Sequence, residues 1–232
     1  YVAQYNLTTY TTEASVAGTR NLLETTTLGS SGATFIPGID APTMSWSGLY
    51  DDGTSGSEVI VNALRDASAA SVVSLYPGTD AIGKLAIASG DAWVDASPVV
   101  TANVGTLVAM SATINLGLVT RSKSCGTQAT ITSSTSGTSI DDAASSSSGG
   151  SWVYHIFALD AVGGNARWHL NLQHSADNSS WADVSSATVA ASDGVGAAKA
   201  SFSGTLNRYV RHRVVLDASS GSLTFAVSYN RA

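Results

Sequence analysis

The chain is poor in cysteine and has no long apolar run. A single cysteine, Cys125, occurs among its 232 residues, so neither an internal disulfide nor a cysteine-based zinc site can form. No histidine or basic cluster adjoins Cys125 to lower its pKa, and we interpret it as a packed, unreactive thiol. No apolar run reaches the roughly 18 residues of a membrane-spanning helix, and no signal peptide opens the chain. We therefore expect synthesis in the cytoplasm and no membrane insertion.

Charge is also scarce, and cations most of all. Charged residues make up 12% of the chain, with 11 Lys and Arg against 17 Asp and Glu, for a formal net charge of −6. Nucleic-acid-binding proteins neutralise phosphates with clustered Lys and Arg, so this balance argues against specific binding of DNA. The acids concentrate before residue 146, where the formal charge is −7, against +1 after it.

The sequence offers no catalytic constellation. No G-x-S-x-G elbow occurs, and His169 and His174 are an odd number of residues apart, which places them on opposite faces of a strand. Residues 78–85 match a phosphate-binding loop up to Lys84, but Leu85 stands where a Ser or Thr must hold magnesium, which favours an inter-strand loop. We expect no enzyme activity, no cofactor and no metal.

Strands dominate what is present. Met44, Trp46 and Tyr50 share one face by the two-residue period, and residues 108–116 alternate cleanly. One helix is expected after Gly53: Ser55 and Glu58 have capping-box spacing, and apolar residues then recur at intervals of three and four, at Ile60, Ala63, Leu64 and Ala67. The pattern predicts an all-β protein, mainly β with one helix.

A Ser/Thr/Gly-rich stretch suggests a domain boundary. We expect a first domain at 1–140, a linker at 141–150 and a small C-terminal antiparallel β-sandwich at 151–232. Aromatic residues of this sandwich could stack on sugars, yet Trp152 and Trp168 share their strand faces with aliphatic residues, which favours the core. Trp152, Trp181 and Tyr209 are the candidates for an exterior ligand surface.

A long Thr/Gly/Ser connection at residues 25–38 precedes the first clear strand. It carries apolar Leu28, Phe35 and Ile36, and loops of this length without structure of their own usually have a function. An apolar extended segment on a strand scaffold suggests docking onto a neighbour.

Three short motifs between residues 23 and 51 carry a family resemblance. They form the pattern TTTxG … PG … sxsGxyD, in Leu23-Glu24-Thr25-Thr26-Thr27-Leu28-Gly29, Phe35-Ile36-Pro37-Gly38-Ile39 and Ser45-Trp46-Ser47-Gly48-Leu49-Tyr50-Asp51. The pattern resembles the signature of tail tube (major tail) proteins of long-tailed bacteriophages, over roughly residues 7–120. The resemblance implies a tail-tube-type β-sandwich flanked by one α-helix.

The same resemblance implies a function and partners. Members assemble as homo-hexameric rings stacked into a hollow tube through which double-stranded DNA leaves the capsid, next to tape-measure and tail-end proteins. The chain would then be a virion protein of the tail, assembled in the host cytoplasm, with its C-terminal sandwich on the tube exterior. We expect an inter-subunit arm buried only after assembly, formed by Leu23, Leu28, Phe35, Ile36 and Ile39, and acidic side chains along the lumen.

One alternative belongs to another class. The chain could be a cell-surface or capsid-decorating binding protein whose C-terminal sandwich binds glycans. Stacked rings in electron microscopy would favour the tube, and lasting monomers with glycan affinity would favour the alternative.

Overall fold

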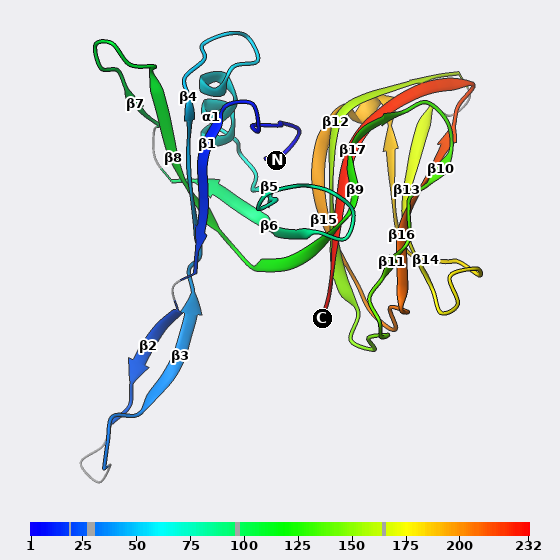
Figure 1. Ribbon diagram of the computed structural model, residues 1–232, viewed down its shortest axis with the longest axis horizontal. Coiled ribbons are helices and arrows are strands. Elements are labelled where there is room, and N and C mark those ends of the chain that lie inside the picture. Colours follow the sequence, from blue (N-terminus) through cyan, green and yellow to red (C-terminus); the bar gives the residue numbers. More distant parts are fainter. Residues whose placement is uncertain (19, 27–30, 96–97, 164–165) are drawn as a thin grey trace. The chain divides into compact units, whose positions relative to one another are not determined.

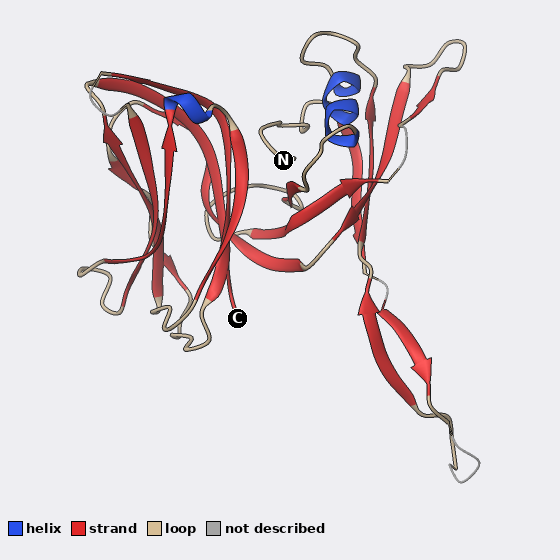
Figure 2. Ribbon diagram, turned by 180° about the vertical axis from the view of Figure 1, so that it is seen from behind, coloured by secondary structure: helices blue, strands red, loops and turns tan. Residues whose placement is uncertain are grey.

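The computed structural model describes residues 1–18, 20–26, 31–95, 98–163 and 166–232, with the side chains of 20, 21, 37 and 39 left out. The described part is mostly antiparallel β-sheet with one α-helix, which confirms the expected all-β class (Figures 1 and 2). The chain forms two compact units. Unit 1 comprises 1–6, 72–90 and 120–232, and unit 2 comprises 7–71 and 91–119.

The division differs from the linker expected at 141–150. That segment belongs to unit 1, where β11 (Ile140–Asp141) pairs with β16 (Tyr209–Asp217) and Ser146 bridges to Leu206. Ser, Gly and Asp suit tight turns between short strands as well as they suit linkers, so composition alone did not separate the two.

Unit 2 is built on a small antiparallel sheet. Its central strand β4 (Thr43–Leu49) lies between β1 (Thr11–Ala17) and β8 (Ala109–Leu116). The end of β6 (Leu85–Val94) and the short β7 (Val99–Thr101) both pair with β8. One face is apolar and packed with α1 (Ser57–Arg65), with Met44, Trp46, Met110, Ala112 and Ile114 all buried. The alternation expected over 108–116 is confirmed, whereas Tyr50 lies beyond the last residue of β4.

The helix forms where it was expected, but its start differs. It begins at Ser57 after the N-cap residue Gly56, which has no capping side chain, so the predicted Ser55–Glu58 capping box is wrong. The Ser57 hydroxyl instead donates to the Leu49 carbonyl at 2.7 Å and accepts from the Asp51 amide at 3.0 Å, which ties the helix to the end of β4. The buried residues are Ser57, Ile60, Val61 and Leu64, while the predicted Ala63 is exposed.

Residues 20–24 and 35–40 form a two-stranded ribbon, which we call the arm. It consists of β2 (Arg20–Glu24) and β3 (Phe35–Asp40), joined to β1 and β4 at one end of the unit 2 sheet (Figure 1). Leu23 lies opposite Ile36, and Glu24 lies opposite Phe35. Residues 35–38 of the segment expected as a structureless connection therefore belong to a paired β-strand.

Unit 1 is a β-sandwich. Its first sheet has the order β6, β9 (Val119–Ile131), β17 (Ser220–Arg231), β12 (Gly150–Val162) and β15 (Gly196–Phe202), and β5 (Ser71–Leu75) pairs with β6. Its second sheet has the order β10 (Thr135–Ser136), β16, β13 (Arg167–Ser175) and β14 (Ala182–Ala190), and the short η1 (Ala191–Asp193) follows. The core between the sheets contains the fully buried Trp152, Trp168, Leu172, Phe225 and Tyr229.

Candidate functional site: the uncovered surfaces of unit 2

The arm exposes large apolar side chains on both faces of its ribbon. Leu22, Leu23, Phe35 and Ile36 are 57%, 51%, 53% and 50% exposed. Neighbouring residues of a strand point to opposite faces, and directly paired residues share one. Leu23 and Ile36 therefore form one face, and Leu22 and Phe35 lie on the other. Fully burying such a side chain stabilises a fold or complex by about 1.5–3 kcal/mol, a gain that the chain by itself realises only in part here.

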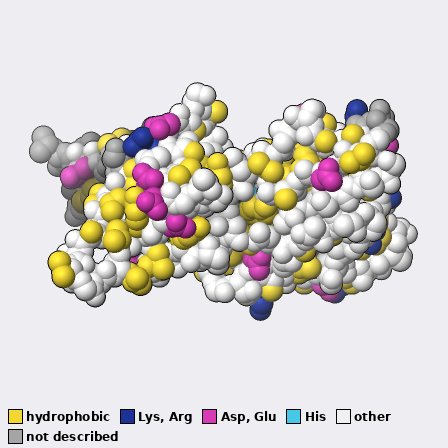
Figure 3. All heavy atoms as spheres, turned by 90° about the horizontal axis from the view of Figure 1, so that it is seen from above, with side chains coloured by type: hydrophobic (Ala, Val, Ile, Leu, Met, Phe, Trp, Pro, Cys, Tyr) yellow, Lys and Arg dark blue, Asp and Glu magenta, His cyan; other side chains and the backbone are white. Residues whose placement is uncertain are grey.

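Exposed apolar residues concentrate in unit 2. Among the described residues, 14 large hydrophobic side chains are exposed, and all but Leu85, Val162 and Val195 belong to unit 2. Besides the four in the arm, these are Val59, Trp93, Val99, Val100, Val104, Leu107 and Leu118. In Figure 3, hydrophobic and acidic side chains gather together on this unit. Large exposed apolar areas on a soluble protein mark interaction sites, which makes unit 2 the candidate assembly unit.

The negative charge of the chain also belongs to unit 2. This unit has nine acidic residues and two basic ones, Arg20 and Arg65, a formal charge of −7, whereas unit 1 has eight acidic and nine basic residues. The division into compact units therefore gives the same net charges, −7 and +1, as the division of the sequence at residue 146.

The sheet face away from α1, which we call the open face, is lined mostly by hydroxyl side chains and is free of cations, and its large apolar residues are Trp93 and Val99. Its rows follow from strand pairing: Glu13, Ser47 and Ser111 lie side by side, and Ser45 lies beside Thr113. Trp93 and Asp91 extend it on β6, and the Trp93 indole donates to the Asp91 carboxylate at 2.9 Å. No Lys or Arg occurs in β1, β4, β7, β8 or residues 91–94. A surface of hydroxyls and carboxylates offers no counter-ion to a passing polyanion.

Two edges of this sheet are available for pairing. Among the described strands, β1 pairs only with β4, and β7 pairs only with β8. An unpaired strand edge presents rows of N–H and C=O groups that another chain can complete. The chain therefore offers edges, an open face and an apolar arm within one unit.

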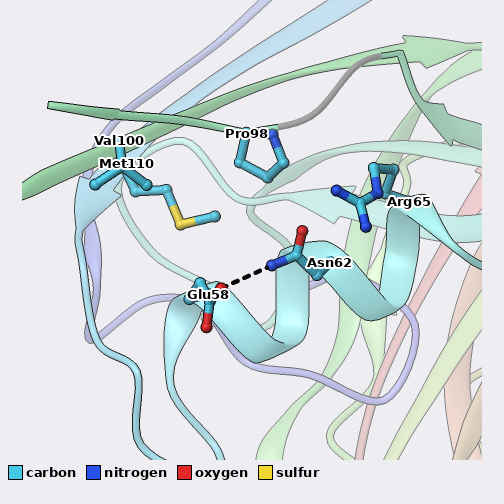
Figure 4. Close-up of a pocket in the computed structure, with 6 residues that line it drawn as sticks. All are labelled: Glu58, Asn62, Arg65, Pro98, Val100 and Met110. Atoms are coloured by element: carbon cyan, nitrogen blue, oxygen red, sulfur yellow. Dashed lines mark hydrogen bonds between the residues drawn. The ribbon is translucent and has the colours of Figure 1, made fainter.

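A hollow of about 450 Å³ lies between α1 and β7, and we call it the α1–β7 hollow. Pro98, Val100 and Met110 form its apolar wall, and the polar side of α1 forms the other wall (Figure 4). On that side the Asn62 amide donates to the Glu58 carboxylate at 3.1 Å, and Arg65 pairs with Asp66 at 2.8 Å. No sequence pattern marks this hollow, because it depends on the pairing of Val100 with Met110.

Of the residues expected in the arm, Leu23, Phe35 and Ile36 lie on the ribbon with exposed side chains. Leu28 and the side chain of Ile39 lie outside the described residues. Leu22 is as exposed as these and was missed, although the two-residue period would have placed it on the second face of the ribbon. The inter-subunit role of the arm stays a prediction.

The expected exterior ligand residues do not form one surface. Trp152 is only 1% exposed, and its indole donates to the Ser185 hydroxyl inside the sandwich, so it belongs to the core. Trp181 and Tyr209 are partly exposed, and an arginine guanidinium stacks on each ring. The guanidinium of Arg211 lies 4.0 Å from the Trp181 ring centre.

The remaining sequence candidates have structural surroundings. Residues 78–84 connect β5 to β6 as a loop, as expected. The buried His155 contacts the Ala3 carbonyl and the Ser74 hydroxyl at 2.7 and 2.8 Å, and burial lowers its pKa. Cys125 is fully buried, and burial raises the pKa of its thiol. Within the described part, no group of three or more His, Cys, Asp or Glu residues could hold a metal ion, and no helix is long and apolar enough to cross a membrane.

No family model matches the chain, and no curated protein sequence matches it. Among solved structures, this chain is similar to a chain of the virion of a native gene transfer agent particle. The two are 10% identical, the alignment covers 48% of this chain and 84% of that chain, and the TM-score is 0.38. This chain is also similar to the SPP1 Dit protein, described as a paradigm of the hub adsorption apparatus in Gram-positive infecting phages. The two are 9% identical, the alignment covers 99% of this chain and 97% of that chain, and the TM-score is 0.39.

A third similar structure is that of infectious bursal disease virus, Gx strain, with 13% identity, 93% of this chain and 55% of that chain covered, and a TM-score of 0.21. All three TM-scores are below 0.5. These similarities therefore establish neither a family nor a shared fold for the chain.

Proposed function

We propose that this chain is a structural virion protein of a phage tail, and that unit 2 assembles into six-fold rings that stack into the tail tube. The observation that carries the proposal is the incompleteness of unit 2. Its apolar arm and its β1 and β7 edges are uncovered in the single chain. Copies of the same chain can cover all of them, because homo-oligomers form through complementary patches on identical subunits.

The proposal assigns the open face to the lumen of the tube. Neighbouring subunits pair through the edges of β1 and β7, so that the unit 2 sheets line a common channel. The hydroxyl rows and the carboxylate of Glu13 then face the DNA. Phosphates and carboxylates repel within a screening length of about 8 Å at physiological salt, so DNA passes without adhering.

The arm contributes to stacking in this arrangement. Its exposed apolar residues extend beyond the sheet, where they can reach a copy outside their own ring. The motifs that resemble tail tube proteins include residues 23–24 and 35–39 of the arm and residues 45–49 of β4, and both elements belong to unit 2. The chain acts as a scaffold in this proposal, with no enzyme activity.

Electron microscopy of the purified chain tests the proposal. We expect tubes or six-fold rings for the natural sequence, and neither for a variant that lacks residues 25–38. Tubes formed by the shortened chain would contradict the role of the arm. Lasting monomers of the natural chain, at concentrations up to the millimolar range, would contradict the assembly. Isolated rings that do not stack would restrict the role to a single ring of the tail.

One observation favours the alternative of a glycan-binding exterior domain. On the outer face of the second sheet of unit 1, the Arg211 guanidinium stacks on Trp181 and donates to the Gln173 amide oxygen at 3.0 Å. The Gln173 amide in turn donates to the Asp183 carboxylate at 2.7 Å. Hydrogen-bonding side chains held beside an aromatic ring suit a sugar. Glycan-array binding by monomers, lost on Trp181→Ala and retained on Tyr209→Ala, would support this alternative.

A further inference from the structure

The α1–β7 hollow and the arm lie at opposite ends of the unit 2 sheet. The arm joins β4 at Thr43, whereas the Val100–Met110 pair that lines the hollow adjoins Gly48, near the other end of β4. Each strand residue advances about 3.3 Å, so these two points are separated by roughly 17 Å. The arm extends further away from this point (Figure 1). A chain therefore cannot place its own arm in its own hollow.

The two features are complementary in chemistry. The hollow has an apolar wall in which Val100 is 47% exposed, and the arm has an uncharged apolar face formed by Leu23 and Ile36. The opposite face of the arm carries Glu24 next to Phe35, so it suits an apolar wall less well. Burial of Leu23 and Ile36 against Val100 removes three exposed apolar side chains from water at once.

We infer that the arm of one copy seats its Leu23–Ile36 face in the α1–β7 hollow of a second copy. The occupant is a second copy because both halves of the contact belong to the same chain, at ends that one chain cannot bring together. Such a contact is heterologous, because each copy binds one neighbour through its arm and another through its hollow. The association therefore repeats head to tail. The inference rests on the proposed function and names the surface that receives the arm.

The two walls of the hollow would meet the arm in different ways. The polar wall on α1 is already paired internally, since Asn62 bonds to Glu58 and Arg65 pairs with Asp66. The arm therefore meets side chains that already have partners within their own chain, and its entry need not break these bonds. The apolar wall supplies the affinity, and the helix limits how far the ribbon can enter.

Cysteine cross-linking of a mixture of two singly substituted chains tests the contact. One chain carries Ile36→Cys and the other Val100→Cys, and Cys125 is buried and does not compete. We expect a short bismaleimide to give covalent dimers in the mixture and none with either chain alone. A chain with both substitutions should give a ladder of oligomers, because a heterologous contact propagates. A mixture of Ile36→Cys with Leu118→Cys, an exposed position outside the hollow, is the matched control and should give no dimer.

The outcomes separate this inference from the proposed function. Tubes in the microscope without the Ile36–Val100 cross-link leave the proposed function standing and overturn the inference. Cross-linked dimers with the Ile36→Cys chain alone mean that arms pair with arms, which also overturns it. The cross-link without rings or tubes supports the contact and counts against the tail tube. Absence of both rejects both.

Discussion

The carboxylate of Asp142 accepts a hydrogen bond from the Nε of Arg231 at 2.6 Å, although the two residues are 89 positions apart. Asp142 also pairs with Lys123 and accepts from the Tyr229 hydroxyl at 2.7 Å. Arg231 donates further to the carbonyl of Leu206 at 2.9 Å. This network ties the segment after β11 to strands β9 and β17, and it explains why residues 141–150 belong to the sandwich.

We predict that Asp142→Ala destabilises unit 1. The Asp142 side chain is only 3% exposed, so its removal leaves Arg231 and the Tyr229 hydroxyl without their partner in a buried place. Breaking one half of a buried pair costs about 3–5 kcal/mol. Chemical denaturation measures the loss. The neighbouring Asp141→Ala is the comparison: its pair with Arg208 is exposed, so we expect a clearly smaller shift of the unfolding midpoint than for Asp142→Ala.

The same carboxylates predict a loss of stability in acid. Two hydrogen bonds from Arg208 lower the pKa of Asp141 to about 2. Burial by itself raises the pKa of Asp142, but the hydrogen bonds from Lys123, Tyr229 and Arg231 outweigh it and hold the pKa below its usual value. A lowered folded-state pKa stabilises the fold above the unfolded value of about 3.9, and this stability is lost as the pH falls toward 2.

Denaturation midpoints at a series of pH values between about 5 and 2 measure this loss. The Asp142→Ala chain should show a shallower decline than the natural chain, because it has one carboxylate fewer to protonate. Equal slopes for the two chains would contradict the assignment.

Cys125 should resist thiol reagents in the folded chain. It is fully buried, and burial raises the pKa of its thiol, so the reactive thiolate is scarce and inaccessible. We expect no labelling by a chromogenic disulfide reagent under native conditions and one equivalent after unfolding. Labelling of the native chain at the rate of a free thiol would show that strand β9 opens.

Gly48→Ala should destabilise unit 2. A Cβ at this position would lie 2.5 Å from the ring of Trp46 and 2.5 Å from the carbonyl oxygen of Tyr10. The Trp46 ring cannot move aside freely, since its Nε1 donates to the Thr11 hydroxyl at 2.8 Å. Overpacking of this kind costs typically about 1–3 kcal/mol. Thermal unfolding measures it, with Gly18→Ala as the control, because nothing lies within 4 Å of a Cβ at Gly18.

Cations on the open face should make assembled tubes bind DNA. We expect the double variant Glu13→Lys and Thr113→Lys to fold normally, because both positions are exposed, and to retain short duplex DNA at low salt. The retention should vanish at high salt, as counter-ion release requires. Glu13→Gln, which removes charge without reversing it, is the control. Tubes of the double variant that release DNA as the natural tubes do would contradict the lumen assignment.

The local patterns of the sequence predicted local structure well. The alternation of Met110, Ala112 and Ile114 predicted a strand with one buried face, and these three residues are buried. The apolar period around Ile60 predicted the helix that the structure contains. The helix start was missed because Ser57 bonds to the end of β4, a tertiary contact that a capping motif does not encode. The all-β class followed from composition and period alone.

The unit boundary and the hollow could not be predicted, because both depend on pairs distant in sequence. The ion pair of Asp142 with Arg231 turns a Ser/Gly-rich stretch into part of a sandwich, and no local pattern marks it. Trp152 was placed among the exterior candidates because an alternating strand shows two faces but not which one a second sheet will cover. The pairing of Leu23 with Ile36 could not be predicted either, because it depends on the register in which β2 and β3 pair.

The order of the strands along the chain constrains how unit 1 can fold during synthesis and how the two units can be separated genetically. Unit 1 takes residues from three separate stretches, and its strand β17 lies between β9 and β12, which are synthesised long before it. The first sheet therefore stays open during translation until β17 has been made, whereas the described strands of unit 2 have been synthesised by residue 116. Residues 72–90 of unit 1 interrupt the sequence of unit 2, so no single cut in the gene separates the two units.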